Sequence, residues 1–159
     1  MKRNRSSMMA LVAISVLVRC AAAFGADNNI GTWNLNLAKS KHSPGLPPKS
    51  HTVKIEAWGD DGVKYTADGM DAEGKPAHAE FQAKYDSKDY AFKGNPDADM
   101  LAYKRIDANT VQATTKMKGK VTITAKVTVS ADGKTRTVSQ TGTDAQGRTV
   151  NNIAVYDKQ

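Results

Sequence analysis

The side chains best suited to hold a ligand in this chain are four tyrosines and one arginine that recur in short alternating segments. They are Tyr65, Tyr85, Tyr103, Arg105 and Tyr156. A phenol combines an apolar ring with a hydroxyl group, and a guanidinium carries a permanent charge and five N–H donors. In an apolar interior this set would orient one polar or acidic end of a small molecule. We predict these five residues as ligand-binding residues.

The arginine leaves two interpretations open. In the segment 100–106 one face carries Arg105 and the other carries Lys104, so either orientation brings a cation toward the interior or its rim. A buried cation needs a partner, such as an acidic ligand, a tyrosine or a tryptophan ring. A cation at the end of a strand instead reaches water. Arg136, which shares a face with Val138, has the same two interpretations.

Neither a metal site nor a catalytic set is predicted. The run from Asn95 to Asp99 spaces oxygen atoms like the start of a calcium loop, but Met100 and Ile106 stand where that loop needs a glycine and a glutamate. Turn chemistry explains the run better. The three histidines lack metal-ligand spacing, and no Ser-His-acid set can be assembled. We therefore expect no metal, no cofactor and no enzymatic activity.

Residues 1–25 have the three parts of a secretory signal. Three basic residues precede the apolar run 8–18, and small residues follow it, so cleavage is expected after Gly25 or after Ala23. Acylation of Cys20 is the alternative, although Arg19 stands where a lipoprotein signal needs a small residue. We expect an exported protein, periplasmic or extracellular, whose mature chain is a single domain over 26–159.

The signal accounts for much of the positive charge. It holds four of the 23 basic residues and none of the 16 acidic ones, so its removal lowers the formal net charge from +7 to +3. The remaining Lys and Arg residues form no stripe with interleaved aromatic residues, and we expect no nucleic-acid partner. The single cysteine also lies in the signal, so packing and strand pairing must stabilise the domain without disulfides. We expect a monomer.

Short alternating segments separated by turn residues run through the whole mature chain. They predict an all-β protein: an up-and-down antiparallel meander of about nine or ten strands closed into a small barrel, because closure removes the exposed edges. The outward rows are polar, so no membrane span is expected. The expected strands cover 31–37, 51–57, 63–68, 77–85, 100–106, 111–117, 121–129, 135–141 and 149–157, with a short strand at 90–92 in a weaker region.

Small residues dominate the predicted inward rows. A barrel lined by alanine leaves volume that larger side chains would fill, which favours a ligand cavity; the alternative is a flattened barrel collapsed on itself. The alanines concerned are Ala57, Ala67, Ala77, Ala79, Ala83, Ala113 and Ala125.

The two ends of the mature chain carry a resemblance. Gly31-Thr32-Trp33-Asn34-Leu35 opens the first strand and Val155-Tyr156-Asp157-Lys158 ends the last, and this pattern resembles the lipocalin and fatty-acid-binding-protein (calycin) superfamily. The resemblance implies that Trp33 plugs the closed end of the barrel, and we expect a cationic side chain beside it. The chain also resembles small exported bacterial proteins without an assigned activity, in runs such as Ala-Lys-Ser-Lys.

Two features depart from the fatty-acid-binding proteins. The connection after the first strand is short and rich in proline, which leaves no room for their helical lid. Their last-strand Arg-x-Tyr, which holds a fatty-acid carboxylate, reads Ala154-Val155-Tyr156 here. The expected function is binding of a small apolar or amphipathic ligand in the barrel cavity. The alternative is a protein-binding module, an inhibitor or an envelope-assembly factor, with a filled interior.

Overall fold

The computed structural model describes residues 27–159, so the predicted signal peptide lies outside the described residues. Ten strands and one short 3-10 helix make up the described chain. They are β1 (Gly31–Leu35), η1 (Leu37–Lys39), β2 (Ser50–Ala57), β3 (Gly62–Met70), β4 (Pro76–Lys84), β5 (Asp86–Lys93), β6 (Met100–Asp107), β7 (Thr110–Met117), β8 (Lys120–Val129), β9 (Thr135–Thr143) and β10 (Thr149–Lys158).

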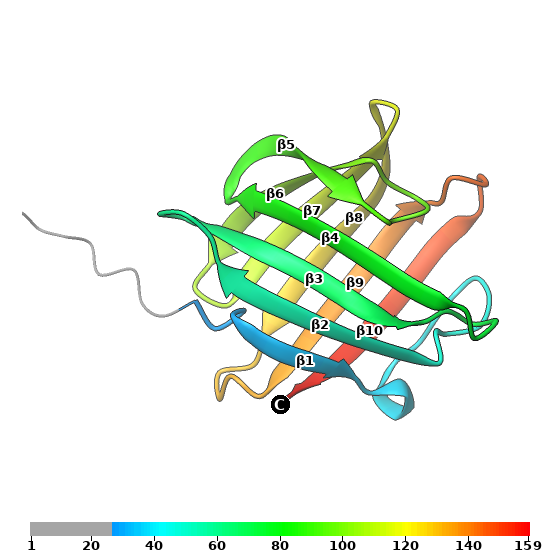
Figure 1. Cartoon of the computed structure of the whole chain (residues 1–159), viewed down its shortest axis with the longest axis horizontal. Helices are drawn as coiled ribbons and strands as arrows, with labels where there is room; N and C mark the ends of the chain where they lie inside the picture. The colour runs from blue at the N-terminus through cyan, green and yellow to red at the C-terminus, as the bar shows by residue number, and fades with distance from the viewer. Residues whose placement is uncertain (1–26) are drawn as a thin grey trace, which may run out of the picture.

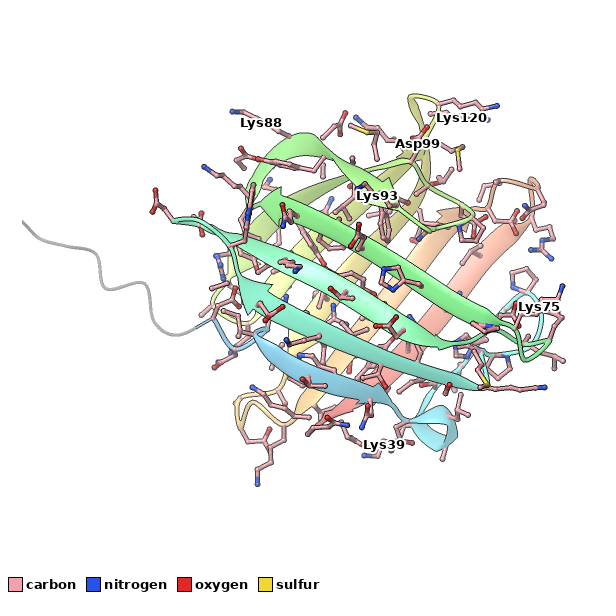
Figure 2. All side chains as sticks on the ribbon, viewed as in Figure 1. Lys39, Lys75, Lys88, Lys93, Asp99 and Lys120 are labelled. Atoms are coloured by element: carbon pink, nitrogen blue, oxygen red, sulfur yellow. The ribbon has the colours of Figure 1, made fainter. Side chains whose placement is uncertain are left out.

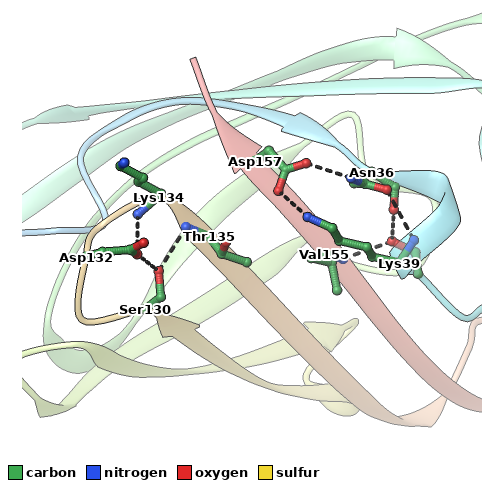
Figure 3. Close-up of polar contacts among 9 residues, drawn as sticks. Asn36, Lys39, Ser130, Asp132, Lys134, Thr135, Val155 and Asp157 are labelled. Carbon is green, nitrogen blue, oxygen red and sulfur yellow. Dashed lines mark hydrogen bonds and ion pairs between the residues drawn. The ribbon is translucent and has the colours of Figure 1, made fainter.

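Each strand pairs with its neighbours in the chain, and β1 pairs with β10, so the sheet closes into a barrel (Figure 1). This confirms the predicted all-β antiparallel meander. Side chains reinforce the closing seam: Asn36 donates to the Asp157 carboxylate at 2.6 Å, and Lys39 lies 3.1 Å from the same group (Figure 3). On the neighbouring β8–β9 turn, Ser130 accepts the backbone N–H of Thr135 at 3.0 Å (Figure 3).

The up-and-down order gives the barrel two distinct ends, because alternate connections lie on the same side. The N-terminal segment and the turns 58–61, 108–109 and 130–134 gather at one end, on the left in Figure 1. The connections 36–49, 71–75, 94–99 and 144–148 gather at the other. We call these the closed end and the mouth.

Trp33 closes the first of these ends. Its side chain is 0% exposed, its indole N–H donates to the Asn29 carbonyl at 2.9 Å, and the Lys158 ammonium lies 5.0 Å from the ring centre. The expectation of a buried tryptophan beside a cation, sealed by the first and last strands, is confirmed. Its neighbours in the sheet are Val53 on β2 and Lys158 on β10.

The weaker region 86–99 contains a longer strand than expected. β5 covers Asp86–Lys93, and its side chains are mostly exposed, which explains why apolar alternation did not reveal its length. β5 pairs with β4 at only two positions, Glu80 with Lys93 and Phe81 with Phe92. Its register with β6 shifts between Asp86 and Asp89. The barrel is therefore least regular at this seam.

The outer surface of the barrel carries many charged side chains (Figure 2). In Figure 2 the labelled lysines, from Lys39 near the mouth to Lys88 and Lys120, point away from the barrel. Within residues 27–159, no helix has the length and apolar character needed to cross a membrane.

Candidate functional site

A cavity of about 330 Å³ occupies the barrel interior and opens toward the mouth. Its size is at the lower end of the range of about 300–1,000 Å³ typical of small-molecule pockets. One wall is aromatic: Tyr65 stacks on Phe81 with 4.6 Å between ring centroids, and Phe92 meets Phe81 edge-on at 5.2 Å. The opposite wall is aliphatic, and its lining residues are Ala113, Ala125, Val127, Val138 and Val150.

The alanine rows contribute to this cavity only in part. Ala79, Ala113 and Ala125 line it. Ala67 and Ala83 are buried but belong to the packed core rather than to the cavity wall. Ala57 and Ala77 are exposed, because they lie close to the ends of β2 and β4 where the strands leave the barrel. The cavity predicted from these rows is therefore present but narrower than seven inward alanines would make it.

A buried arginine lies at the inner end of the cavity. Arg136 is 3% exposed, lines the cavity, and faces Tyr156 across the β9–β10 pair. Its Nε donates to Asn29 Oδ1 at 2.9 Å, and its guanidinium carbon lies 5.5 Å from the Tyr156 ring centre. No carboxylate of residues 27–159 forms an ion pair with Arg136. Arg136 thus lines a cavity with both polar and apolar walls, and no carboxylate of the described chain neutralises its charge there.

Three phenols line the cavity together with this cation. They belong to Tyr65, Tyr103 and Tyr156. Burial raises the pKa of all three hydroxyl groups, and the positive charge of Arg136 opposes that rise. The phenols are therefore neutral at physiological pH and can donate hydrogen bonds. With Arg136 they form a donor set suited to an anionic or strongly polar group.

His51 extends this polar set toward the mouth. Its Nδ1 lies 2.9 Å from the Tyr156 hydroxyl oxygen. Burial lowers the pKa of His51, and the nearby charge of Arg136 lowers it further, while Asp68 acts in the opposite direction. The ring is therefore neutral near physiological pH. It holds the Tyr156 hydroxyl in place and adds no second positive charge.

Two of the five predicted ligand-binding residues lie outside the cavity, at the closed end. The Tyr85 hydroxyl donates to Asp27 at 2.7 Å, and the Arg105 guanidinium packs 3.9 Å from the Tyr85 ring centre. Arg105 forms ion pairs with Asp27 at 3.2 Å and Asp61 at 3.6 Å. Tyr85 and Arg105 lie outside the cavity because Tyr85 directly precedes β5 and Arg105 is close to the end of β6. Tyr65, Tyr103 and Tyr156 are brought together around the cavity, and Tyr85 and Arg105 are not.

The mouth is bounded by connections that hydrogen bonds hold together. Asn95 Oδ1 accepts the backbone N–H of Asp97 at 2.8 Å, and the Asp97 carboxylate accepts the N–H of Ala145 at 3.0 Å. Asp144 pairs with Arg148 at 2.6 Å within the next turn. Residues 95–99 therefore form a turn that joins two connections. In the described part of the chain, no group of three His, Cys, Asp or Glu side chains is placed to hold a metal ion.

The sequence left open whether Arg136 faces the interior, and Arg105 was predicted as the ligand-binding arginine instead. Asn29 and His51 were not predicted as site residues. The alternation of Arg136 with Val138 gave a signal that this arginine faces inward. Its depth depends on the register that pairs it with Tyr156, which alternation alone does not provide. Asn29 precedes the first strand, where no periodicity applies.

Comparisons of the sequence with protein-family models and with curated proteins give no match.

Proposed function

We propose that this protein is an exported small-molecule binding protein whose barrel cavity holds an amphipathic ligand with an acidic end. The observation that carries the proposal is Arg136, a buried cation that lines the cavity and has no ion pair within residues 27–159. A charge in such surroundings is costly unless it is paired. A ligand carboxylate would supply the missing partner, and the aromatic and aliphatic walls would cover its apolar body.

The open interior favours this function over a protein-binding module. A module that acts through its outer surface needs no cavity, and core packing ordinarily leaves few voids larger than a water molecule. Here a cavity of about 330 Å³ coincides with the buried cation and three phenols. The likeness to lipocalins and fatty-acid-binding proteins supports the same proposal through the Gly-x-Trp at the start of the barrel. Tyr156 then pairs with an arginine on the neighbouring strand instead of one on its own strand.

The test is titration calorimetry of the mature protein with decanoic acid and with 1-decanol. A hydrogen bond to a charged group contributes about 1.5–3 kcal/mol. Arg136→Met should therefore weaken decanoic acid about tenfold to a hundredfold and change 1-decanol little. The substitution removes the charge and retains an apolar side chain of similar length.

Arg105→Met is the matched control. It removes the other arginine near the closed end, whose charge is already paired with Asp27 and Asp61 and which does not line the cavity. Decanoic acid should bind this variant with nearly wild-type affinity, provided that circular dichroism gives the same fold. If the wild type binds neither compound, or if both variants weaken decanoic acid equally, the proposal is wrong.

A further inference from the structure

Asn29 lies next to Arg136 on the side of the closed end, and hydrogen bonds fix its position. The residue is 4% exposed, and its backbone N–H donates to the Asp27 carboxylate at 3.0 Å. The Ile30 N–H closes the same turn by donating to the Asp27 carbonyl at 3.0 Å, and the Trp33 indole donates to the Asn29 carbonyl at 2.9 Å. The turn and the buried tryptophan therefore position the amide oxygen that accepts from Arg136.

An asparagine leaves two groups unsatisfied at this position. Its Nδ2 is buried and has no hydrogen-bond partner in the described chain, and Arg136 has no counter-charge there. A buried donor without a partner and an unpaired buried cation both reduce stability. An aspartate has almost the same shape. It would remove the orphaned N–H groups and give Arg136 an ionic partner.

The second arginine near the closed end makes the contrast clear. Arg105 is paired with two carboxylates, those of Asp27 and Asp61. Arg136 instead donates to the neutral amide oxygen of Asn29. Of the two arginines, Arg136 is the one that lines the cavity. The chain therefore neutralises the cation outside the cavity and leaves the cation inside it uncompensated. Departures of this kind from the most stable choice are typical of functional positions.

We propose that Asn29 is a positioning residue that makes the cavity selective for a ligand with a carboxylate over a neutral one. It orients Arg136 through Nε with an uncharged oxygen, so the terminal nitrogens keep their full charge for a carboxylate, the partner that matches their geometry. The inference rests on the proposed function and adds the residue that sets its charge selectivity. It also predicts how that selectivity can be removed without removing the arginine.

The test compares Asn29→Asp with Asn28→Asp, which adds the same charge at the adjacent position. The Asn28 side-chain amide donates to Asn109 Oδ1 at 2.9 Å, whereas Arg136 donates to Asn29. In Asn29→Asp the affinity for decanoic acid should fall about tenfold to a hundredfold, because the new carboxylate forms an ion pair with the Arg136 guanidinium and competes with the ligand. The affinity for 1-decanol should stay within about twofold, as a neutral ligand does not depend on that charge. The thermal midpoint should not decrease, and Asn28→Asp should keep the wild-type preference for the acid.

Asn29→Ala separates charge from packing. Asn29→Ala removes the oxygen that positions Arg136 but leaves the positive charge of Arg136. The affinity for decanoic acid should therefore decrease, while the protein still prefers decanoic acid over 1-decanol. A merely structural role would reduce binding of both compounds in both variants. The inference is overturned if Asn29→Asp keeps the acid preference, or if it unfolds, because the carboxylate should be accommodated. If Arg136→Met removes the preference for the acid but Asn29→Asp keeps it, the inference about Asn29 fails while the proposed function stands; if the wild type binds neither compound, both fail.

Discussion

At the scale of single residues, two arginines near the closed end have opposite electrostatic surroundings. Arg105 pairs with Asp27 and Asp61, whereas Arg136 is held by the Asn29 amide and faces the cavity. The difference arises from the acidic residues that reach each guanidinium. Asp27 lies in the N-terminal turn and Asp61 in the β2–β3 turn, and both contact the cation at the end of β6. Arg105 therefore has two ionic partners, and Arg136 has none in the described chain.

The histidines allow a test of this electrostatic account through the pH dependence of stability. Burial and the charge of Arg136 lower the pKa of His51 from 6.5. The unfolded chain therefore takes up that proton more readily, and His51 reduces stability as the pH falls below 6.5. His51→Gln should lose less stability than the wild type when the pH is lowered through this value. Urea denaturation across the pH range measures the free energy of unfolding.

His78 is the matched control, because its pKa moves in the opposite direction. Its hydrogen bond to Asp68, 2.7 Å long on the outer surface, raises its pKa from 6.5. Its stabilising contribution is thus present below 6.5 and is lost as the pH rises through the folded-state pKa. His78→Gln should lose more stability on acidification than the wild type. The same pH slope in all three proteins would contradict the account.

At the scale of elements, β4 and β5 have the fewest paired residues of any neighbouring strands in the barrel. The β3–β4 pair joins nine residue pairs, whereas the β4–β5 pair joins two. A surface pocket of about 300 Å³ lies over this seam, and Tyr65 and Phe81 line both that pocket and the cavity. The aromatic stack of Tyr65 and Phe81 therefore stands between the seam and the interior.

Hydrogen exchange should identify this seam. Backbone amides that face an unpaired strand open at low free energy, while those in a continuous ladder exchange through larger openings. Amides in 82–91 that point across the seam should exchange at rates close to those of an unfolded chain. Amides of β8 and β9, which pair on both sides, should be the slowest. Uniform protection of all ten strands would show that the seam is closed in solution.

The sequence predicts strands well where one face is apolar and poorly where neither is. β8 has a clear inward row, from Ile123 to Val129, and its bounds were predicted to within a residue. β5 exposes most side chains, and its existence depends on backbone pairing to β6 that periodicity does not reveal. The candidate site is likewise predictable only where apolar alternation places its residues. The sequence predicts the three tyrosines on β3, β6 and β10, but the choice between Arg105 and Arg136 depends on cross-strand register.

At the scale of the whole molecule, the barrel forms a cavity with a defined polarity. Trp33 and the N-terminal turn block one end, Arg136 and the phenols stand at the inner part, and the polar connections around Asp97 and Asp144 bound the mouth. An amphipathic acid would enter with its carboxylate first and leave its tail toward the mouth. The central claim is therefore that the acidic end of the ligand reaches Arg136.

The most direct measurement is a ¹⁵N–¹H NMR titration that resolves the arginine side-chain Nε–H groups as decanoic acid is added to the mature protein. The account predicts a saturable shift of the Arg136 Nε–H resonance, together with the backbone amides around Tyr103 and Tyr156. The Arg105 resonance should remain near its starting position, since its carboxylate partners are unchanged. Saturable binding that leaves the Arg136 resonance unmoved, or shifts confined to amides on the outer face of the barrel, would contradict the account.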